Sequence, residues 1–326
     1  MRAVNDSSPS TSARYRAFAE IDASGQSASF EALALGVADD PEVIRRVDEL
    51  PVPKRQVNLV FASARSVGAP VDSYQGFREF LITNWDSIRD VALQRSTQTN
   101  EAGRCAVLLP LLASLPQPLA LIELGASAGL CLYPDRYSYR YGDTVLHPAD
   151  GPSAVELRCE LSGPVPVPDR LPTVAWRAGI DLNPLDLFNE ADMTWLATLV
   201  WPEHHERRER LRSAIEIARL DPPRIHRGDA VEDLAALVAQ APAEATVVVF
   251  HSAVAAYFDR NSRERLVSIV GELPVRWISN EGQKVLPGVA ARLDAPVQDP
   301  SLFLLALDGQ PVGLAGGHGQ SLHWLA

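Results

Sequence analysis

The clearest chemical pattern in the chain is an apolar run that ends in a turn of small residues. Glu123 stands near the end of the run, Gly125 and Gly129 bound the turn, and Ser127 lies between them. Because glycine has no side chain, the backbone at such positions can approach a ligand closely. A helix that begins directly after the turn would add unpaired N–H groups and a partial positive charge. The segment therefore predicts a strand, a ligand-binding turn and a helix start.

The spacing of the glycines separates the ligand classes that use such turns. The dinucleotide fingerprint G-x-G-x-x-G, started at Gly125, requires a third glycine where the chain has Leu130, and the lysine of a phosphate-binding P-loop is absent. Glu-x-Gly-x-Ser-x-Gly instead resembles the first motif of methyltransferases that use S-adenosylmethionine. This resemblance implies cofactor contacts from Glu123, Gly125, Ala126, Ser127 and Gly129. The alternative is a tight turn that binds nothing.

Two acidic residues follow later apolar runs in the order that such enzymes require. Asp181 and Leu182 come directly after a predicted strand, where an acid in these enzymes accepts hydrogen bonds from the ribose hydroxyls. Asp229 and Ala230 follow the next run, where the resemblance implies contact with the adenine amine. Either aspartate can instead cap the turn or helix that follows it.

Three further residues are candidates for the substrate side of this site. His251 ends an apolar run, and a histidine titrates near neutral pH, so it could contact the cofactor and act as a base. Glu281 follows the next run and could bind a cationic group or act as a base, and Tyr257 could reach the same cleft. The alternatives are a buried structural histidine, a solvated loop at Glu281 and core packing of Tyr257.

A polar run precedes the apolar helix that leads into the first strand. In methyltransferases this helix packs beside the methionine part of the cofactor, so Asn100 and Arg104 are candidates to bind its carboxylate and amine ends. Capping of the helix by Thr99 or Asn100 is the alternative.

A serine hydrolase and a metal site are the other chemistries to weigh. The glycine turn also fits the nucleophile pattern G-x-S-x-G, and Ser127, Asp229 and His251 follow in hydrolase order. Everything upstream of the turn is predicted to be helical, however, whereas a nucleophile turn normally follows several strands. His204 and His205 are adjacent on a predicted helix and point to different faces, so no metal site is expected.

The elements that must position these residues change character near residue 115. Apolar residues repeat at helical spacing through 13–115, and no buried strand is indicated there. From 116 to 326 short apolar runs alternate with helical stretches, which indicates a parallel sheet covered on both faces. Residues 133–172 interrupt this alternation and are expected to be an insertion with extra strands. Residues 1–12 are predicted to be a disordered tail.

The expected fold is therefore α/β, with a helical domain before it. The sheet is predicted to be Rossmann-like, seven-stranded and of the methyltransferase type. It is expected to close with a C-terminal antiparallel hairpin formed by Leu302 to Leu307 and Val312 to Trp324 around the turn at Asp308-Gly309.

Composition limits the partners. The net charge of −11 argues against nucleic acid or an anionic membrane, because a phosphate backbone needs a basic face. The segment at His251 also lacks the Asn/Asp-Pro-Pro-aromatic pattern of enzymes that methylate nucleic-acid amines. Three unpaired cysteines, no signal-peptide pattern and no long apolar stretch favour a cytoplasmic protein with a small-molecule substrate. The expected function is methyl transfer from S-adenosylmethionine to a small molecule. The alternative is a non-catalytic binding or scaffold protein that keeps the fold, which Ser127 at a usual glycine position favours. The oligomeric state and the methyl acceptor are open.

Several short motifs resemble a bacterial family known as domain of unknown function 2332. They are Gln98 to Glu101, Arg104-Cys105, Leu108 to Pro110, Gly125 to Leu130, Asp135 to Tyr137, Trp201 to Glu203 and Phe250 to Ser252. The resemblance covers nearly the whole chain. It supports a methyltransferase-like fold, and the family has no assigned reaction that could be carried over.

Overall fold

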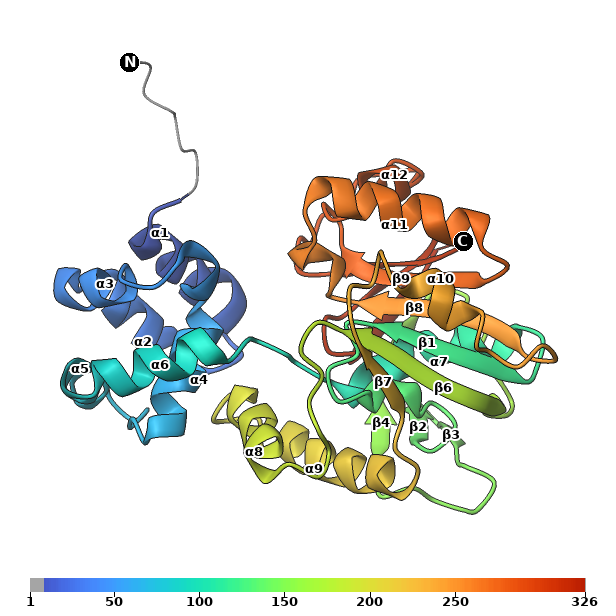
Figure 1. Ribbon diagram of the computed structural model, residues 1–326, viewed down its shortest axis with the longest axis horizontal. Helices are drawn as coiled ribbons and strands as arrows, with labels where there is room; N and C mark the ends of the chain where they lie inside the picture. Colours follow the sequence, from blue (N-terminus) through green and yellow to red (C-terminus); the bar gives the residue numbers. More distant parts are fainter. Residues whose placement is uncertain (1–8, 326) are drawn as a thin grey trace. The chain divides into compact units, whose positions relative to one another are not determined.

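The computed structural model describes residues 9–325 of the chain (Figure 1). By its contacts the described chain forms two compact units. The first runs up to Thr99 and also includes Ala191–Glu209, whereas the second comprises Asn100–Glu190 and the residues from Arg210 onward. The division falls at 99 rather than at the expected 115, and the first unit is discontinuous. Of the predicted tail at 1–12, residues 1–8 lie outside the described part of the chain. Residues 11 and 12 belong to the first helix.

The first unit is helical, as its apolar spacing predicts. Its helices are α1 (Thr11–Ala17), α2 (Ala28–Ala38), α3 (Pro41–Val47), α4 (Val57–Val67), α5 (Tyr74–Thr83), α6 (Trp85–Gln94), most of α8 (Glu190–Leu199) and the start of α9 (His205–Leu220), with a π-helical turn at Phe18–Ala23 and a 3₁₀ turn at Val52–Lys54. Local signals set the boundaries. Ser27 and Asp40 cap α2 and α3 with their side chains, and Gly68 ends α4 in the left-handed conformation at φ 110°.

The later segment 191–209 completes the core of the first unit. Trp195 is 3% exposed and belongs to the same apolar cluster as Phe61 of α4. Arg65 donates to the backbone carbonyls of Thr198 and Val200, 2.7 and 2.8 Å away. Glu203 Oε2 accepts from the Ser27 hydroxyl at 2.6 Å. The packing of these helices therefore depends on a segment that is separated from them by about ninety residues of the second unit.

The second unit is built on a mixed sheet of nine strands in the order β5-β12-β11-β10-β9-β8-β1-β6-β7 (Figure 1). The strands are β1 (Leu119–Leu124), β5 (Glu160–Ser162), β6 (Val174–Asp181), β7 (Arg224–Arg227), β8 (Thr246–Ser252), β9 (Arg276–Gly282), β10 (Phe303–Leu307), β11 (Gln310–Ala315) and β12 (Ser321–Trp324). The α/β class is thus confirmed. The sheet, however, has nine strands where seven were expected.

The core of this sheet is parallel, and β1 lies at its centre. β1 pairs in parallel with β6 on one side and with β8 on the other, and all six of its residues are buried. β7 and β9 continue the sheet outward in parallel. The parallel strands therefore follow the chain order third, second, first, fourth, fifth. In such doubly wound sheets ligands bind beyond the carboxyl ends of the strands, where the winding reverses; here that point lies between β1 and β8.

The C-terminal part of the sheet is a meander rather than a single hairpin. β10 is antiparallel to both β9 and β11 around the Asp308-Gly309 turn, as predicted. The stretch after this turn forms two strands, however, because the glycine-rich residues 316–319 make a second turn before β12. β5 from the predicted insertion pairs with β12 at the sheet edge.

The rest of the predicted insertion forms a separate small sheet. Its strands are β2 (Ser138–Tyr141), β3 (Thr144–Leu146) and β4 (Glu156–Arg158), in the order β3-β2-β4. The Tyr141 hydroxyl donates to the Ala106 carbonyl of α7 (Cys105–Ser114), the helix that leads into β1. This contact, at 2.6 Å, ties the small sheet to α7.

Short helices cover one face of the large sheet. They are α10 (Leu234–Val238), α11 (Arg260–Glu272) and α12 (Pro287–Ala290). Leu234 of α10 and Leu266 of α11 are fully buried in one apolar cluster with Ile122 and Val249 of the central strands. Within residues 9–325 no helix has the length and apolarity needed to cross a membrane.

Candidate functional site

The predicted site residues of the second unit gather at one edge of its sheet. The glycine turn follows β1, Asp181 ends β6 and Asp229 follows β7. On the other side of β1, His251 lies near the end of β8 and Glu281 near the end of β9. Because these strands are parallel, all five positions lie at the carboxyl edge, the position at which such sheets bind ligands.

The backbone N–H groups of the glycine turn donate hydrogen bonds to neighbouring groups of the protein. The N–H groups of Gly125 and Ala126 both donate to the Ile180 carbonyl, at 2.8 and 3.2 Å. Ser127 N donates to Asp181 Oδ2 at 2.8 Å, and Leu130 N donates to Asn100 Oδ1 at 2.8 Å. These amides therefore hold the turn against its neighbours rather than standing open to an anion.

The expected helix start after the turn is wrong. Leu130–Leu132 forms a single 3₁₀ turn, and the chain leaves it at Tyr133. Pro134 disfavours helical geometry at the residue before it, which ends the turn early. The turn is therefore not followed by a helix whose N-terminus would add a partial positive charge.

Gly125 is required for two reasons that do not involve a ligand. Its φ is +68°, in the left-handed region that favours glycine. A Cβ built there would also lie 2.2 Å from Cγ2 of Val254. Val254 therefore fills the space that the missing side chain leaves, and the glycine itself does not indicate close approach of a ligand.

The two aspartates have structural partners. Asp181 Oδ2 accepts from Ser127, and its Oδ1 accepts from Asn183 N at 2.7 Å. Asp229 Oδ1 accepts from the amides of Val231 and Glu232, at 2.8 and 3.2 Å, which is the capping arrangement left open above. A carboxylate accepts about four hydrogen bonds, so Asp229, which accepts two on one oxygen, retains acceptor capacity for a ligand.

His251 is closed off from solvent and uses both ring nitrogens. It is 0% exposed. The Trp277 indole Nε1 can only donate, and it lies 3.1 Å from His251 Nε2, so Nε2 accepts. The ring proton is therefore on Nδ1, which donates to Glu281 Oε1 at 2.7 Å. This geometry leaves neither nitrogen to take a proton from a substrate.

Glu281 is a buried carboxylate that is satisfied on one oxygen only. Besides His251, the amides of Val254 and Ala255 donate to Oε1, each at 3.0 Å. Burial alone would raise the pKa of Glu281, but these hydrogen bonds outweigh it and lower the pKa, which favours the charged form. Oε2 is buried without a partner. The side chain, 2% exposed, is thus part of the interior rather than of a solvated loop.

Three more side chains near this edge hold a buried oxygen without a partner. They are Glu123 Oε2 on β1, Ser127 Oγ in the glycine turn and Asn280 Oδ1 on β9. Burial, with a contribution from Cys131, raises the pKa of Glu123 well above its ordinary value and favours the neutral acid. Ser127 also has a φ of +54°, a conformation that costs a non-glycine residue energy. Unpartnered buried polar atoms are rare in proteins and call for a ligand or water.

Arg104 is a buried guanidinium held only by backbone carbonyls. It is 8% exposed, and it donates to the carbonyls of Gly317 at 3.1 Å and Ser252 at 3.0 Å. No carboxylate of the described residues lies within ion-pair distance of it, although it lowers the pKa of Glu123 electrostatically. Asn100 is also buried, and its Oδ1 caps Leu130.

Close backbone contact positions Arg104. A Cβ built at Gly319 would lie 2.0 Å from the Gly103 carbonyl oxygen, and one at Gly103 would lie 2.5 Å from the His318 carbonyl oxygen. Glycine at both positions lets the 3₁₀ turn Ala102–Arg104 dock directly on the turn before β12.

The remaining predicted residues take other positions. Leu182 is 64% exposed and Tyr257 is 63% exposed, so Tyr257 does not pack in the core. Ala126 is fully buried, and Ala230 lies in the apolar cluster under α10. The hydrolase set is not assembled, because the hydrogen bonds of His251 go to Trp277 and Glu281 rather than to Ser127 or Asp229.

One residue that shapes this site, Trp277, escaped the sequence reasoning. Trp277 fixes the tautomer of His251 but reads in the sequence as an ordinary strand aromatic. Asn280, directly before Glu281 in β9, is 0% exposed and also belongs to this edge. Within residues 9–325 no group of three or more His, Cys, Asp or Glu side chains has an arrangement that could hold a metal ion.

Comparison with known proteins gives a family and no close relative of known structure. A family described as "Uncharacterized protein conserved in bacteria (DUF2332)" matches residues 12–324. Neither a curated protein nor a solved structure is significantly similar to the chain. Because the match spans both units, the chain belongs to this bacterial family.

Proposed function

We propose that this protein binds S-adenosylmethionine at the carboxyl edge of β1 and transfers its methyl group to a small molecule. The observation that carries the proposal is the set of buried polar groups without partners at this edge. Their atoms belong to Glu123, Ser127, Asn280 and Glu281, and they lie on β1, in the turn after it and on β9. Leaving each such group unpaired costs about 1–3 kcal/mol, which a ligand with matching groups would recover.

The charges of the set fit the amino-acid end of the cofactor. Arg104 has no carboxylate partner, so it suits a ligand carboxylate. The free oxygen of Glu281 suits an ammonium group, since that side chain favours its charged form. A neutral Glu123 can both donate and accept a hydrogen bond.

The other end of the cofactor would lie along the neighbouring strands. The ribose hydroxyls would lie near Asp181 at the end of β6, and the adenine amine would lie near Asp229, one strand further. The bound cofactor would supply an electrophilic methyl group. The chain's own contribution would be to orient the methyl group toward its acceptor and to exclude water.

A binding protein without transfer activity is the second candidate. The closed hydrogen-bonding of His251 favours it, because the residue best suited by type to act as a base is occupied on both nitrogens. The two candidates share the same ligand site and differ only in turnover.

Titration calorimetry with S-adenosylhomocysteine, the demethylated cofactor, tests the site. We expect binding to the wild-type protein, and binding about 10–100-fold weaker in Glu281→Gln and in Arg104→Gln, because each removes one charge-assisted hydrogen bond of about 1.5–3 kcal/mol. Glu281→Gln keeps the size of the side chain, so it separates charge from packing.

Glu244→Gln is the control, since Glu244 is exposed and lies before β8, at the opposite end of that strand. Absence of heat and of thermal stabilisation with millimolar ligand would contradict the cofactor site. Binding that both site variants retain at full strength would place the ligand elsewhere. If binding is confirmed but no acceptor is methylated in a screen, the second candidate is favoured.

A further inference from the structure

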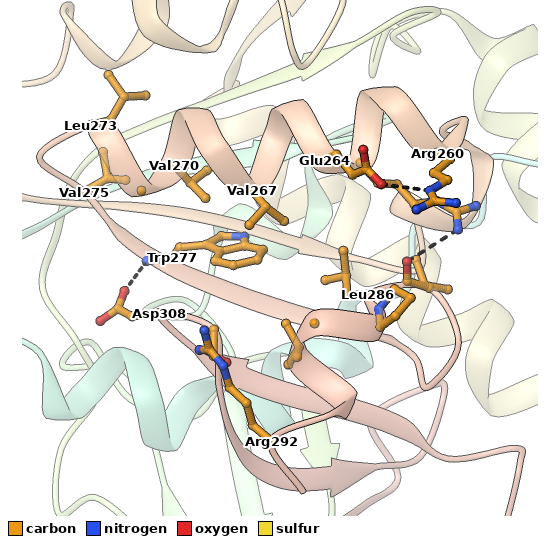
Figure 2. A pocket seen from close by; sticks show the side chains of 17 residues that line it. Arg260, Glu264, Val267, Val270, Leu273, Val275, Trp277, Leu286, Arg292 and Asp308 are labelled. Carbon is orange, nitrogen blue, oxygen red and sulfur yellow. Dashed lines mark hydrogen bonds and ion pairs between the residues drawn. The ribbon is translucent and has the colours of Figure 1, made fainter.

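A separate pocket lies under α11, away from the edge just described. It has a volume of about 950 Å³ and is lined by α11, α12, β9 and the turn between β10 and β11. Figure 2 shows Trp277 at its centre, with Val267 and Val270 of α11 on one side and Leu286 and Arg292 on the other. Pockets of about 300–1,000 Å³ with mainly apolar walls and a few polar groups are typical of small-molecule sites.

The charged groups around this pocket do not balance. Arg260 is paired with Glu264 at 2.8 Å, and Asp308 is engaged by Arg276 and by the Trp277 backbone amide. The two remaining charged residues of the lining, Arg263 and Arg292, therefore give the pocket its positive charge.

Arg263 and Arg292 have only backbone partners. Arg263 donates to the carbonyls of Ala255, Ala256 and Val285, and Arg292 donates to the Gly309 carbonyl at 2.6 Å. Within residues 9–325 neither has a carboxylate within ion-pair distance. Two guanidinium groups without an ion pair among residues 9–325 thus border an apolar pocket in a chain whose net charge is −11.

We infer that this pocket is a second small-molecule site, which takes an apolar carboxylic acid, aromatic or long-chain. The acid's body would lie against Trp277, Val267 and Val270, and its carboxylate would lie at Arg292. This assignment does not depend on cofactor binding at β1. It uses the two features that the pocket offers together, apolar walls and unbalanced positive charge.

The position of Trp277 gives the second site a route to the first. The ring that forms the centre of the pocket also donates to His251 Nε2, and His251 donates to Glu281. A ligand that shifts the indole changes the hydrogen bond that fixes the His251 tautomer. The free oxygen of Glu281, proposed above to bind a ligand, lies at the end of this chain.

Decanoate is the probe for the test, with 1-decanol as its uncharged counterpart. By calorimetry we expect one decanoate per chain with a Kd below about 1 mM, and decanol binding about tenfold more weakly. In ¹H–¹⁵N spectra of the indole groups, decanoate is expected to shift the resonance of Trp277, which Trp277→Phe identifies among the six tryptophans.

Two variants and two matched controls locate the site. Arg292→Gln should weaken decanoate about tenfold, and Val267→Asp should weaken it at least tenfold, because it places a carboxylate on the apolar wall. Arg158→Gln and Val52→Asp change exposed residues outside the pocket and should bind decanoate as the wild type does.

The outcomes that overturn the inference are specific. No saturable binding of decanoate, or binding that Val267→Asp leaves intact, removes the site. Equal binding of decanol and decanoate, with no effect of Arg292→Gln, removes the assignment to acids. Val267→Asp keeps the test decisive even if Arg292→Gln fails to fold, since Val267 is 42% exposed on a helix surface.

Discussion

The pKa values of two buried glutamates near the carboxyl edge of the sheet are shifted in opposite directions. Burial raises the pKa of Glu123, whereas hydrogen bonds from His251, Val254 and Ala255 overcome burial and lower the pKa of Glu281. Both residues are buried glutamates, and the hydrogen bonds that Glu281 accepts are the main reason that it favours the charged form whereas Glu123 favours the neutral one.

Glu123→Gln is expected to change how stability depends on pH. With its pKa raised on folding, Glu123 takes up a proton when the chain folds above its ordinary pKa of 4.5. Stability from this group is complete below that pH and is lost as the pH rises, by up to about 1.4 kcal/mol per pH unit. Glutamine does not ionise, so the variant does not lose this stability as the pH rises. In urea unfolding between pH 4 and pH 8, the free energy of unfolding of the variant should therefore increase relative to that of the wild type as the pH rises.

Glu281→Gln provides the opposite sign. The lowered pKa of Glu281 gives stability that is present above pH 4.5 and is lost as the pH falls below it. The free energy of unfolding of this variant should therefore increase relative to that of the wild type only at acidic pH. Parallel stability curves for wild type and both variants would show that neither carboxyl changes its protonation on folding.

The turn after β1 is an element whose shape follows from its own packing. Gly125→Ala is expected to destabilise the protein by more than about 2 kcal/mol. A left-handed alanine costs about 1–2 kcal/mol, and the methyl group also meets Val254. The same change in a Val254→Ala background should cost less, which a double-mutant cycle in urea measures as a coupling of about 1 kcal/mol.

Gly142→Ala is the control for backbone strain alone. Gly142 has a φ of +58°, and a Cβ built there meets nothing within 4 Å. If Gly125→Ala costs no more than Gly142→Ala, the contact with Val254 does not constrain the turn.

At the scale of elements, apolar runs predicted the buried central strands and missed the short strand at the edge of the sheet. The runs at β1, β8 and β10 were clear because each strand is flanked on both sides and buried. β5 is a short edge strand without such a run, so its pairing with β12 could not be foreseen. The helix expected after the glycine turn ends within one 3₁₀ turn, and the signal for this was local, because Pro134 follows Tyr133 directly.

For the candidate site residues, the sequence predicted their placement at the edge of the sheet and not their contacts. Sequence order indicated that the turn, Asp181 and Glu281 would meet at one edge, because parallel strands share their carboxyl ends. It gave no sign that Trp277 and Glu281, from a different strand, would occupy both nitrogens of His251. Residue type suggested a base, and only the fold shows that the ring is enclosed.

At the scale of the molecule, the first unit is completed by a distant segment of chain. Trp195→Ala is expected to destabilise that unit by about 3–5 kcal/mol, because it empties a buried position in its core. Hydrogen exchange should show lost protection in α2 and α4, while β1 and β8 keep theirs, since these strands belong to the second unit.

Leu93→Ala is the comparison, because Leu93 is 44% exposed and its truncation should leave exchange unchanged. Equal loss of protection in the strands of the sheet after Trp195→Ala would show that the two units unfold as one.

The divided first unit has a consequence for biosynthesis. Chains emerge from the ribosome at about 5–20 residues per second, and N-terminal domains usually fold first. Here α1 to α6 emerge without Trp195 and without Glu203, which binds the Ser27 hydroxyl. β1 and β6 are synthesised before either of these residues. The helices made first must therefore wait, with apolar surface uncovered, until the central strands have been translated, and this is the interval in which a nascent chain would most need a chaperone.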